Sequence, residues 1–309
     1  RRTPLFAARA GFPRTVAPSR NFFSGPATPP RAGLVAKVAA LSVGTATAGV
    51  SFWAHAKTAE PVGATAPKHD IVLYQYDVCP YCNKVKAFLD YSGIPYTAVE
   101  VNPLNKKQIA FSEYKKVPIV HVDGQQIEQS SDIVTALNEL YHTVPEPSSP
   151  AAGQEEKMWR EWVDDYFVHL LSPNIYRSPT EANQAFEYIV DNGNWGKVET
   201  LAARYVGAVV MYMIGKKLKS KNKIDDERLA LYDACNTWVR AVGSRDMMGG
   251  SQPNMADLAV FGVLRAISKM DTFRDVMRHS NIQPWYKRVE SCVGPEMRIN
   301  PRKSAIKSE

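Results

Sequence analysis

The pattern of apolar and polar positions predicts two regions of different secondary structure, the first of them mixed. Short apolar or alternating runs predict four strands, at residues 71–74, 96–101, 116–122 and 125–127. Apolar residues at helical spacing predict helices directly after the first strand, at 104–114 and at 132–141. Asp123 and Gly124 form a tight turn between the last two strands, and Ser130 or Ser131 caps the last helix. The expected order is therefore β-α-β-α-β-β-α.

The second region has apolar positions at helical spacing and few strand signals. The expected helices are 158–171, 180–190, 198–218, 228–242 and 257–268. A stretch rich in Pro and Ser, residues 143–156, separates the two regions and is expected to be a linker. The fold class predicted from the pattern is an α+β domain followed by an all-helical domain.

The N-terminal part contains a run without charge. Residues 38–54 are 17 uncharged positions, the lower limit for a membrane-spanning helix, so we expect an N-terminal membrane anchor helix. Ala40, Gly44 and Ala48 fall four residues apart, the spacing by which helices pack closely in a bilayer. One interpretation is a partner in a membrane complex, and the other is that small residues are merely common here.

Charge is distributed unevenly along the chain. Residues 1–60 hold eight Lys or Arg and one acid, whereas residues 61–309 hold 30 basic and 30 acidic residues. The globular part therefore shows no nucleic-acid footprint. Residues 1–32 are rich in Arg, Pro, Ala and Ser and contain no acid, which is typical of a mitochondrial or plastid targeting segment; a basic arm is the alternative. With an anchor behind it, this segment predicts a mitochondrial protein held in a membrane, the inner one being favoured.

These patterns divide the chain into seven segments. They are a targeting segment or basic arm (1–32), a transmembrane helix (33–57), a linker (58–69), the α+β domain (70–142), a second linker (143–156), the helical domain (157–295) and a basic tail (296–309).

Candidate chemistry lies where the first strand meets its helix. Cys79 and Cys82 form a C-x-x-C pair at that junction, where free backbone N–H groups and the helix dipole stabilise a thiolate. We expect Cys79 to be the exposed nucleophile and Cys82 the shielded resolving thiol, with the Tyr76 hydroxyl near the Cys79 sulfur. A zinc site would need further ligands, and the other cysteines, Cys235 and Cys292, are isolated. Two buried cysteines without chemistry are a further alternative.

The helical region contains one specific local signal. In the run 249–258, Asn254 is expected to cap a helix and Asp257 to reach back to it as a capping box. A substitution there should affect folding before chemistry.

The element order and two motifs resemble a known superfamily. Cys79-Pro80-Tyr81-Cys82 and the Val117-Pro118 step are similar to the thioredoxin-like domain of glutaredoxins and glutathione transferases. The resemblance implies an α+β thioredoxin-like domain followed by an all-α transferase-like domain.

The same resemblance implies a glutathione site. Pro118 would follow a cis peptide bond, and Val117 would hydrogen-bond the cysteinyl part of glutathione. The loop with Gln129, Ser130 and Ser131 would hold the γ-glutamyl end, since a helix N-terminus with free N–H groups is a carboxylate site. Gln129 stands where many relatives have an acid, which leaves open which residue would bind the ammonium group of glutathione.

Further runs resemble a narrower family, the membrane-associated prostaglandin E synthases of type 2. They are 73–76 with Cys79-Pro80, 115–118, 172–177, 216–219 and 283–286. The short connection between residues 128 and 157 is similar to plant and protist members. The resemblance implies a glutathione-dependent isomerase that converts prostaglandin H2 to prostaglandin E2 through Cys79, with haem as a second cofactor in some members.

Two other functions stay open from the sequence. The first is a glutaredoxin-like thiol–disulfide oxidoreductase, favoured by the same C-P-Y-C motif. The second is a non-catalytic accessory subunit of a respiratory complex in the mitochondrial inner membrane. Homodimers are common among transferase folds, so a homodimer is an expectation from analogy.

Overall fold

A computed structural model describes residues 69–103, 105–192 and 207–301. The predicted targeting segment, the anchor helix and its residues Ala40, Gly44 and Ala48 lie outside these residues. So does the beginning of the helix predicted at 198–218. None of the helices in the described part of the chain is both long enough and apolar enough to span a bilayer.

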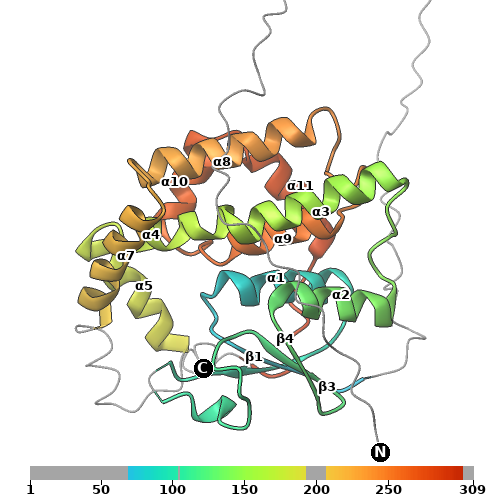
Figure 1. The fold of residues 1–309 in the computed structure, drawn as a ribbon, viewed down its shortest axis with the longest axis horizontal. Coiled ribbons are helices and arrows are strands. Elements are labelled where there is room, and N and C mark those ends of the chain that lie inside the picture. Colours follow the sequence, from blue (N-terminus) through green and yellow to red (C-terminus); the bar gives the residue numbers. More distant parts are fainter. Residues whose placement is uncertain (1–68, 104, 193–206, 302–309) are drawn as a thin grey trace, which may run out of the picture. The chain divides into compact units, whose positions relative to one another are not determined.

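A four-stranded mixed sheet forms the base of the structure (Figure 1). Its strands are β1 (Ile71–Gln75), β2 (Thr97–Glu100), β3 (Ile119–Val122) and β4 (Gln125–Glu128), in the spatial order β2-β1-β3-β4. Strand β1 pairs in parallel with β2 and antiparallel with β3, which pairs antiparallel with β4. All four predicted strands are confirmed.

Two helices cover one face of this sheet, α1 (Pro80–Tyr91) and α2 (Ser130–Tyr141) (Figure 1). The helix predicted at 104–114 is wrong, since only a short 3₁₀ turn, η1 (Lys107–Ile109), forms there. Lys106 adopts a left-handed backbone with φ of 50°, and the Asn105 side chain accepts a hydrogen bond from the backbone N–H of Lys107 at 3.1 Å. Both features favour a turn over a continuous helix.

The rest of the described chain is helical. Its elements are α3 (Pro150–Asp165), η2 (Phe167–Leu170), α4 (Leu171–Ile175), α5 (Pro179–Asn192), α7 (Ala208–Lys221), α8 (Glu227–Val242), α9 (Met255–Arg265), α10 (Asp271–His279) and α11 (Gln283–Val293). Helix α3 begins well before the predicted residue 158, because the Ser149 hydroxyl caps it at the N–H of Ala152 and Pro150 fits the first turn.

Helix α9 joins the helical part to the α+β part. Its residues from Met255 to Leu264 are buried, and Gly262 lies directly against the backbone of α1. The predicted capping box is confirmed: the Asn254 side chain accepts from the N–H of Asp257, whose carboxylate accepts from the N–H of Asn254. The site at the start of α1 is therefore held from below by the sheet and from above by α9 (Figure 1).

The segment after α11 returns to the free edge of the sheet. Tyr96 donates its N–H to Met297 at 3.2 Å and accepts from Ile299 at 2.9 Å. The Asn300 side chain bonds both backbone groups of Ala98 at 2.9 Å. Residues that belong to the expected basic tail thus cover the edge of β2.

Candidate active site

The two cysteines occupy different positions in the first turn of α1. Cys79 is the N-cap residue, and its Sγ accepts a hydrogen bond from the backbone N–H of Cys82 at 3.4 Å. Cys79 is half-buried, whereas Cys82 is fully buried, and both thiols are free. The junction predicted from the sequence is where the structure places the pair.

This placement separates the acidities of the two thiols. Hydrogen bonding from the Cys82 thiol, then from backbone N–H groups of the turn, lowers the pKa of Cys79, and the Lys86 ammonium adds to this. Burial is the main cause that raises the pKa of Cys82 well above its ordinary value. The pair can therefore hold one thiolate, at Cys79, with Cys82 as its hydrogen-bond donor.

The α+β part supplies one wall beside the sulfur. Tyr76 and Tyr114 pack with Cys79 in a small apolar cluster that includes Val117. The Val117-Pro118 peptide bond is cis, as the resemblance implied. Burial, followed by the charge of Cys79, raises the pKa of Tyr76 to about 12, so its phenol remains protonated at neutral pH. The structure thus brings Tyr76, Cys79, Cys82 and Val117 together.

The helical part supplies a residue that was not among the predicted site residues. Tyr176 follows α4 and is buried, and its pKa is raised to about 12 by burial and by the charge of Cys79. Tyr81 shows the same value, with burial first among its causes and Cys79 among the others. Tyr176 falls within the run 172–177 that carries part of the family resemblance, but the sequence assigned it no role, because only tertiary packing brings it near Cys79.

The start of α2 differs from the prediction in its cap. Gln129, with φ of 62°, is the N-cap residue and makes no capping bond, while Ser130 is the buried first residue of the helix. The Ser131 hydroxyl donates to Asp164 Oδ2 of α3 at 2.6 Å and accepts from Lys84 Nζ at 3.1 Å. The expectation of a serine cap is therefore wrong, because the Ser131 side chain is used between helices.

A buried charge cluster lies behind the cysteines. Lys86 Nζ pairs with Asp77 Oδ1 at 2.7 Å, and Glu100 Oε1 accepts from the N–H of Asp77 at 2.8 Å. The Asn83 amide donates to the carbonyl oxygens of Asp77 and Cys79 at 2.8 and 3.0 Å. These bonds fix the loop that presents the Cys79 sulfur. Asp77, Asn83 and Lys86 also line a cavity of about 360 Å³ that reaches α9.

The part of the chain that the structure describes contains no set of side chains suited to bind a metal ion. No group of three or more His, Cys, Asp or Glu side chains could hold an ion there. The remaining cysteines are separate from the pair: Cys235 is buried with its pKa raised to about 12, and burial also raises the pKa of Cys292.

Comparison with known proteins defines the class. Residues 73–147 match the family model described as glutathione S-transferase, N-terminal domain. The crystal structure of human glutathione transferase theta-2, in complex with glutathione and an unknown ligand, matches 74% of this chain and 84% of its own, with a TM-score of 0.51 and 18% identity. The chain thus has the glutathione transferase fold, a thioredoxin-like domain followed by a helical domain.

The sequence relatives define the family within this class. Prostaglandin E synthase 2 of Mus musculus is 41% identical in an alignment 346 positions long, which covers 94% of this chain and 89% of the mouse protein. The chain therefore belongs to the prostaglandin E synthase 2 family. Glutaredoxin 1 of Rickettsia conorii is 32% identical over 95 residues, covering 28% of this chain and 93% of the bacterial protein.

Proposed function

We propose that this protein is a glutathione-dependent isomerase that converts the endoperoxide prostaglandin H2 to prostaglandin E2 with the Cys79 thiolate. The observation that carries the proposal is the Cys79 sulfur itself. It is partly exposed at a helix start, accepts a backbone N–H, and has a lowered pKa. A cysteine nucleophile needs this combination of access and acidity.

The residues around the sulfur fit the peptide backbone of glutathione. Val117, which precedes the cis bond to Pro118, belongs to the same apolar cluster as Cys79, and its backbone would pair with the cysteinyl part of glutathione. Ser130 and the first N–H groups of α2 suit the γ-glutamyl carboxylate, since the first turn of a helix has free donors. Asp132, which is exposed and accepts from the Gln129 amide at 3.1 Å, is an acid suited to the glutathione ammonium.

The proposed reaction is redox-neutral. The Cys79 thiolate attacks one endoperoxide oxygen, so a sulfur–oxygen bond forms while the oxygen–oxygen bond breaks. The released oxygen takes a proton and becomes the hydroxyl group. A base then removes the hydrogen from the carbon that bears the sulfur-bound oxygen, the carbonyl forms, and the sulfur–oxygen bond breaks to return the thiolate.

The chain's own side chains assist at stated atoms. Tyr76 and Tyr176, both protonated at neutral pH, lie within electrostatic reach of the sulfur and can donate to a developing oxyanion. Glutathione, when bound, supplies a thiol that keeps Cys79 reduced. Haem rests on the resemblance alone and has no role in this proposal.

Turnover of prostaglandin H2 by two single variants tests the proposal. Cys79→Ser should lose isomerase activity by at least about 100-fold, because it removes the nucleophile. Cys82→Ser is the matched control, since the mechanism uses its thiol only as a donor, and it should retain most activity. Equal activity of Cys79→Ser and the unmodified protein would rule the mechanism out.

A thiol–disulfide oxidoreductase is the second candidate. The observation that favours it is the fully buried Cys82, which lies one turn from Cys79 and donates its backbone N–H to the Cys79 sulfur. In this case, Cys82→Ser would stop turnover and accumulate a mixed disulfide between Cys79 and glutathione. The same variant therefore separates the two candidates.

The location of the protein is part of the proposal. We infer a mitochondrial, membrane-anchored protein from residues 1–32 and 38–54. A role as an accessory subunit of an inner-membrane complex would make Ala40, Gly44 and Ala48 the packing face. Extraction in mild detergent tests this role, since a chain that migrates alone or as a homodimer would argue against a stable complex.

A further inference from the structure

Helix α7 and the residues beside it have an unusual composition. Residues 207–224 contain no Asp or Glu, and the first half of the run is apolar. The second half carries five lysines, namely Lys216, Lys217, Lys219, Lys221 and Lys223. An apolar segment and a strongly basic segment thus follow each other within one helix and its end.

The apolar side chains of α7 are exposed. Val209 is 59% exposed, Val210 is 46% exposed and Met213 is 65% exposed, and the neighbouring Ile214 is exposed as well. A single exposed aliphatic side chain is ordinary, but four within two helical turns form a contiguous apolar patch.

The apolar and basic side chains share one face. Val210, Met213, Lys217 and Lys221 lie at spacings of three and four residues, which places them in a row along the helix. The opposite face packs inward, where Gly215 lies so close to Tyr176 that a Cβ would be 3.0 Å from it. The orientation of α7 is therefore fixed by its buried side.

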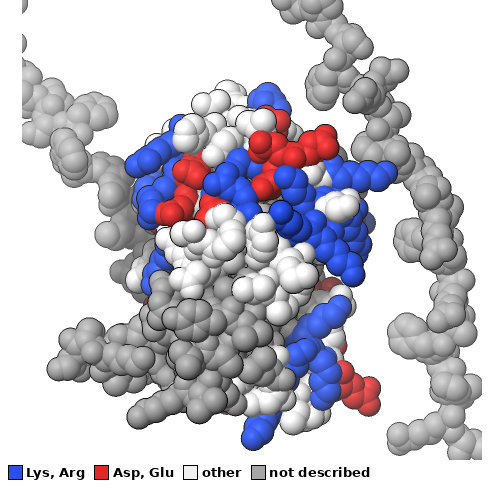
Figure 2. All heavy atoms as spheres, turned by 90° about the vertical axis from the view of Figure 1, so that its left-hand side faces the viewer, with Lys and Arg blue, Asp and Glu red and all other residues white. Residues whose placement is uncertain are grey.

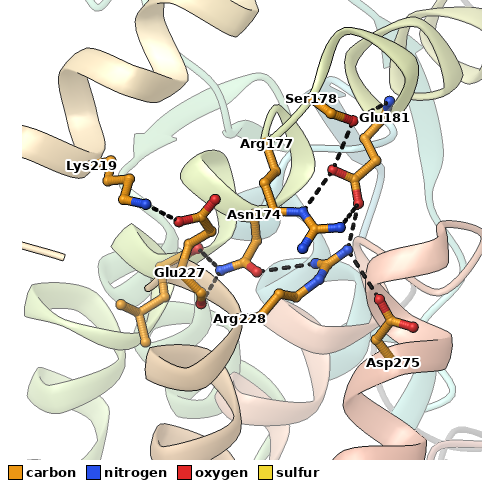
Figure 3. A network of polar contacts seen from close by, with 9 residues as sticks. Asn174, Arg177, Ser178, Glu181, Lys219, Glu227, Arg228 and Asp275 are labelled. Atoms are coloured by element: carbon orange, nitrogen blue, oxygen red, sulfur yellow. Dashed lines mark hydrogen bonds and ion pairs between the residues drawn. The ribbon is translucent and has the colours of Figure 1, made fainter. Parts of the chain in front are cut away.

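Acidic side chains close to α7 are already paired with cations in a polar network (Figure 3). Glu227 pairs with Lys219, and Glu181 pairs with both Arg177 and Arg228. Lys216 lies over the Tyr212 ring, 5.0 Å from its centroid. The lysines on the outer row, in contrast, form no ion pair with a described residue. The outer face thus keeps its positive charge.

The side view of the molecule is consistent with this arrangement. Figure 2 looks onto the side on which α7 lies in Figure 1, and a patch of uncharged side chains faces the viewer with Lys and Arg side chains gathered beside it. Exposed aliphatic groups, next to cations that have no ion-pair partner among the described residues, are the combination that binds at the surface of an anionic bilayer.

We propose that this face of α7 docks on the surface of an anionic phospholipid membrane. Val209, Val210, Met213 and Ile214 enter the headgroup layer, and Lys217, Lys221 and Lys223 contact the phosphates and carboxylates of the lipids. A second copy of this face fits less well, because residues 207–224 contain no Asp or Glu that could pair with the lysines of the other copy. The proposal does not depend on the isomerase activity.

The test uses the full 309-residue chain and a tryptophan probe of depth. Met213→Trp is compared with Met158→Trp, an equally simple change at an exposed methionine of α3 that has Glu155, Glu156 and Glu161 for neighbours. Each variant is mixed with phosphatidylcholine vesicles that carry brominated acyl chains, with and without phosphatidylserine. An N-terminal anchor that inserts in both kinds of vesicle contributes equally to both variants, so it does not affect the comparison between them.

We expect phosphatidylserine to increase quenching of the indole introduced by Met213→Trp and to leave Met158→Trp unchanged. The triple change Lys217→Glu, Lys221→Glu and Lys223→Glu should abolish this increase, since it weakens binding to an anionic surface on the order of 100-fold or more. Equal quenching of both indoles, or none, would overturn the proposal. So would an emission shift of the Met213→Trp variant with protein concentration alone, which would assign the face to a second copy.

Discussion

The different chemistry of Cys79 and Cys82 follows from their positions within one helical turn. As the N-cap residue, Cys79 receives hydrogen bonds at its sulfur and is partly exposed, whereas Cys82 faces the core. The Lys86 ammonium lies one further turn along α1 and favours negative charge at both sulfurs. The acidity of Cys79 is thus a property of the helix start and its buried cation.

At the same scale, Glu100 makes stability depend on pH. Burial raises its pKa to about 7 in the folded protein, so between about pH 4.5 and 7 the folded form holds a proton that the unfolded chain releases. Stability is therefore lost as pH rises through this window. We predict that raising the pH from 5 to 8 destabilises the unmodified protein more than Glu100→Gln. The free energy of unfolding of the variant should therefore gain ~1–2 kcal/mol relative to that of the unmodified protein over this range.

Chemical denaturation of both proteins at the two pH values measures this difference. Glu139→Gln, on the exposed side of α2, serves as the surface control. A gap between Glu100→Gln and the unmodified protein that stays constant with pH would show that Glu100 does not titrate in this range.

The sequence predicted the site residues that short local motifs mark, but not those that only tertiary packing brings to the site. Cys79 and the cis bond before Pro118 could be predicted because short motifs mark them. Tyr176 and Asp164 could not, because each reaches the site from a helix far along the chain.

At the scale of elements, the packing of α9 on α1 positions the site. A Cβ at Gly262 would lie 2.6 Å from the carbonyl oxygen of Asn83 and 2.7 Å from Cα of Lys84. Since Asn83 also bonds the loop at Asp77 and Cys79, a shift of α1 would reach the reactive sulfur. The two helices can approach so closely only because residue 262 has no side chain.

We predict that Gly262→Ala destabilises the protein by about 1–3 kcal/mol, because the backbone of α1 must move. Gly153→Ala in α3 is the matched control. Its Cβ would meet only Pro147 at an ordinary 3.5 Å, so the gain in helix propensity should leave stability unchanged or improve it. Thermal unfolding compares the two, and a Gly262→Ala protein as stable as the control would contradict the close packing.

The elements themselves were predicted unevenly. The strands and the capping box at Asn254 and Asp257 follow from alternation and from cap chemistry, which are local. The helix expected at 104–114 is absent because Lys106 takes a left-handed backbone, a choice that periodicity does not encode. Helices α10 and α11 were not predicted; α10 has nine residues, of which Thr272 and Val276 are buried.

At the scale of the described molecule, charged pairs join the α+β part to the helical part. Asp90 of α1 is 1% exposed and bonds Arg265 of α9 at 2.7 Å, while it also accepts from the N–H of Met297 at 2.8 Å. Lys84 of α1 pairs with Asp164 of α3 in the same way. We therefore expect both parts to unfold in one transition.

We predict that Arg265→Met destabilises the protein by about 3–5 kcal/mol, because it leaves Asp90 buried without its cation. The double change Asp90→Leu and Arg265→Met should recover a large part of this loss, since it removes the buried charge as well. Calorimetry gives both the stability and the number of transitions. A double variant no more stable than Arg265→Met would contradict this account of the interface.

The central claim is that Cys79 carries a thiolate at a glutathione site, and alkylation of the full chain at varied pH tests it most directly. Mass spectrometry follows Cys79 separately, with the partly exposed Cys292 as the internal comparison. We predict that Cys79 reacts with a pKa below the ordinary ~8.5 of a free cysteine, that Cys292 reacts only at higher pH, and that reduced glutathione protects Cys79 alone. A Cys79 that titrates with Cys292 and is indifferent to glutathione would contradict the proposed function.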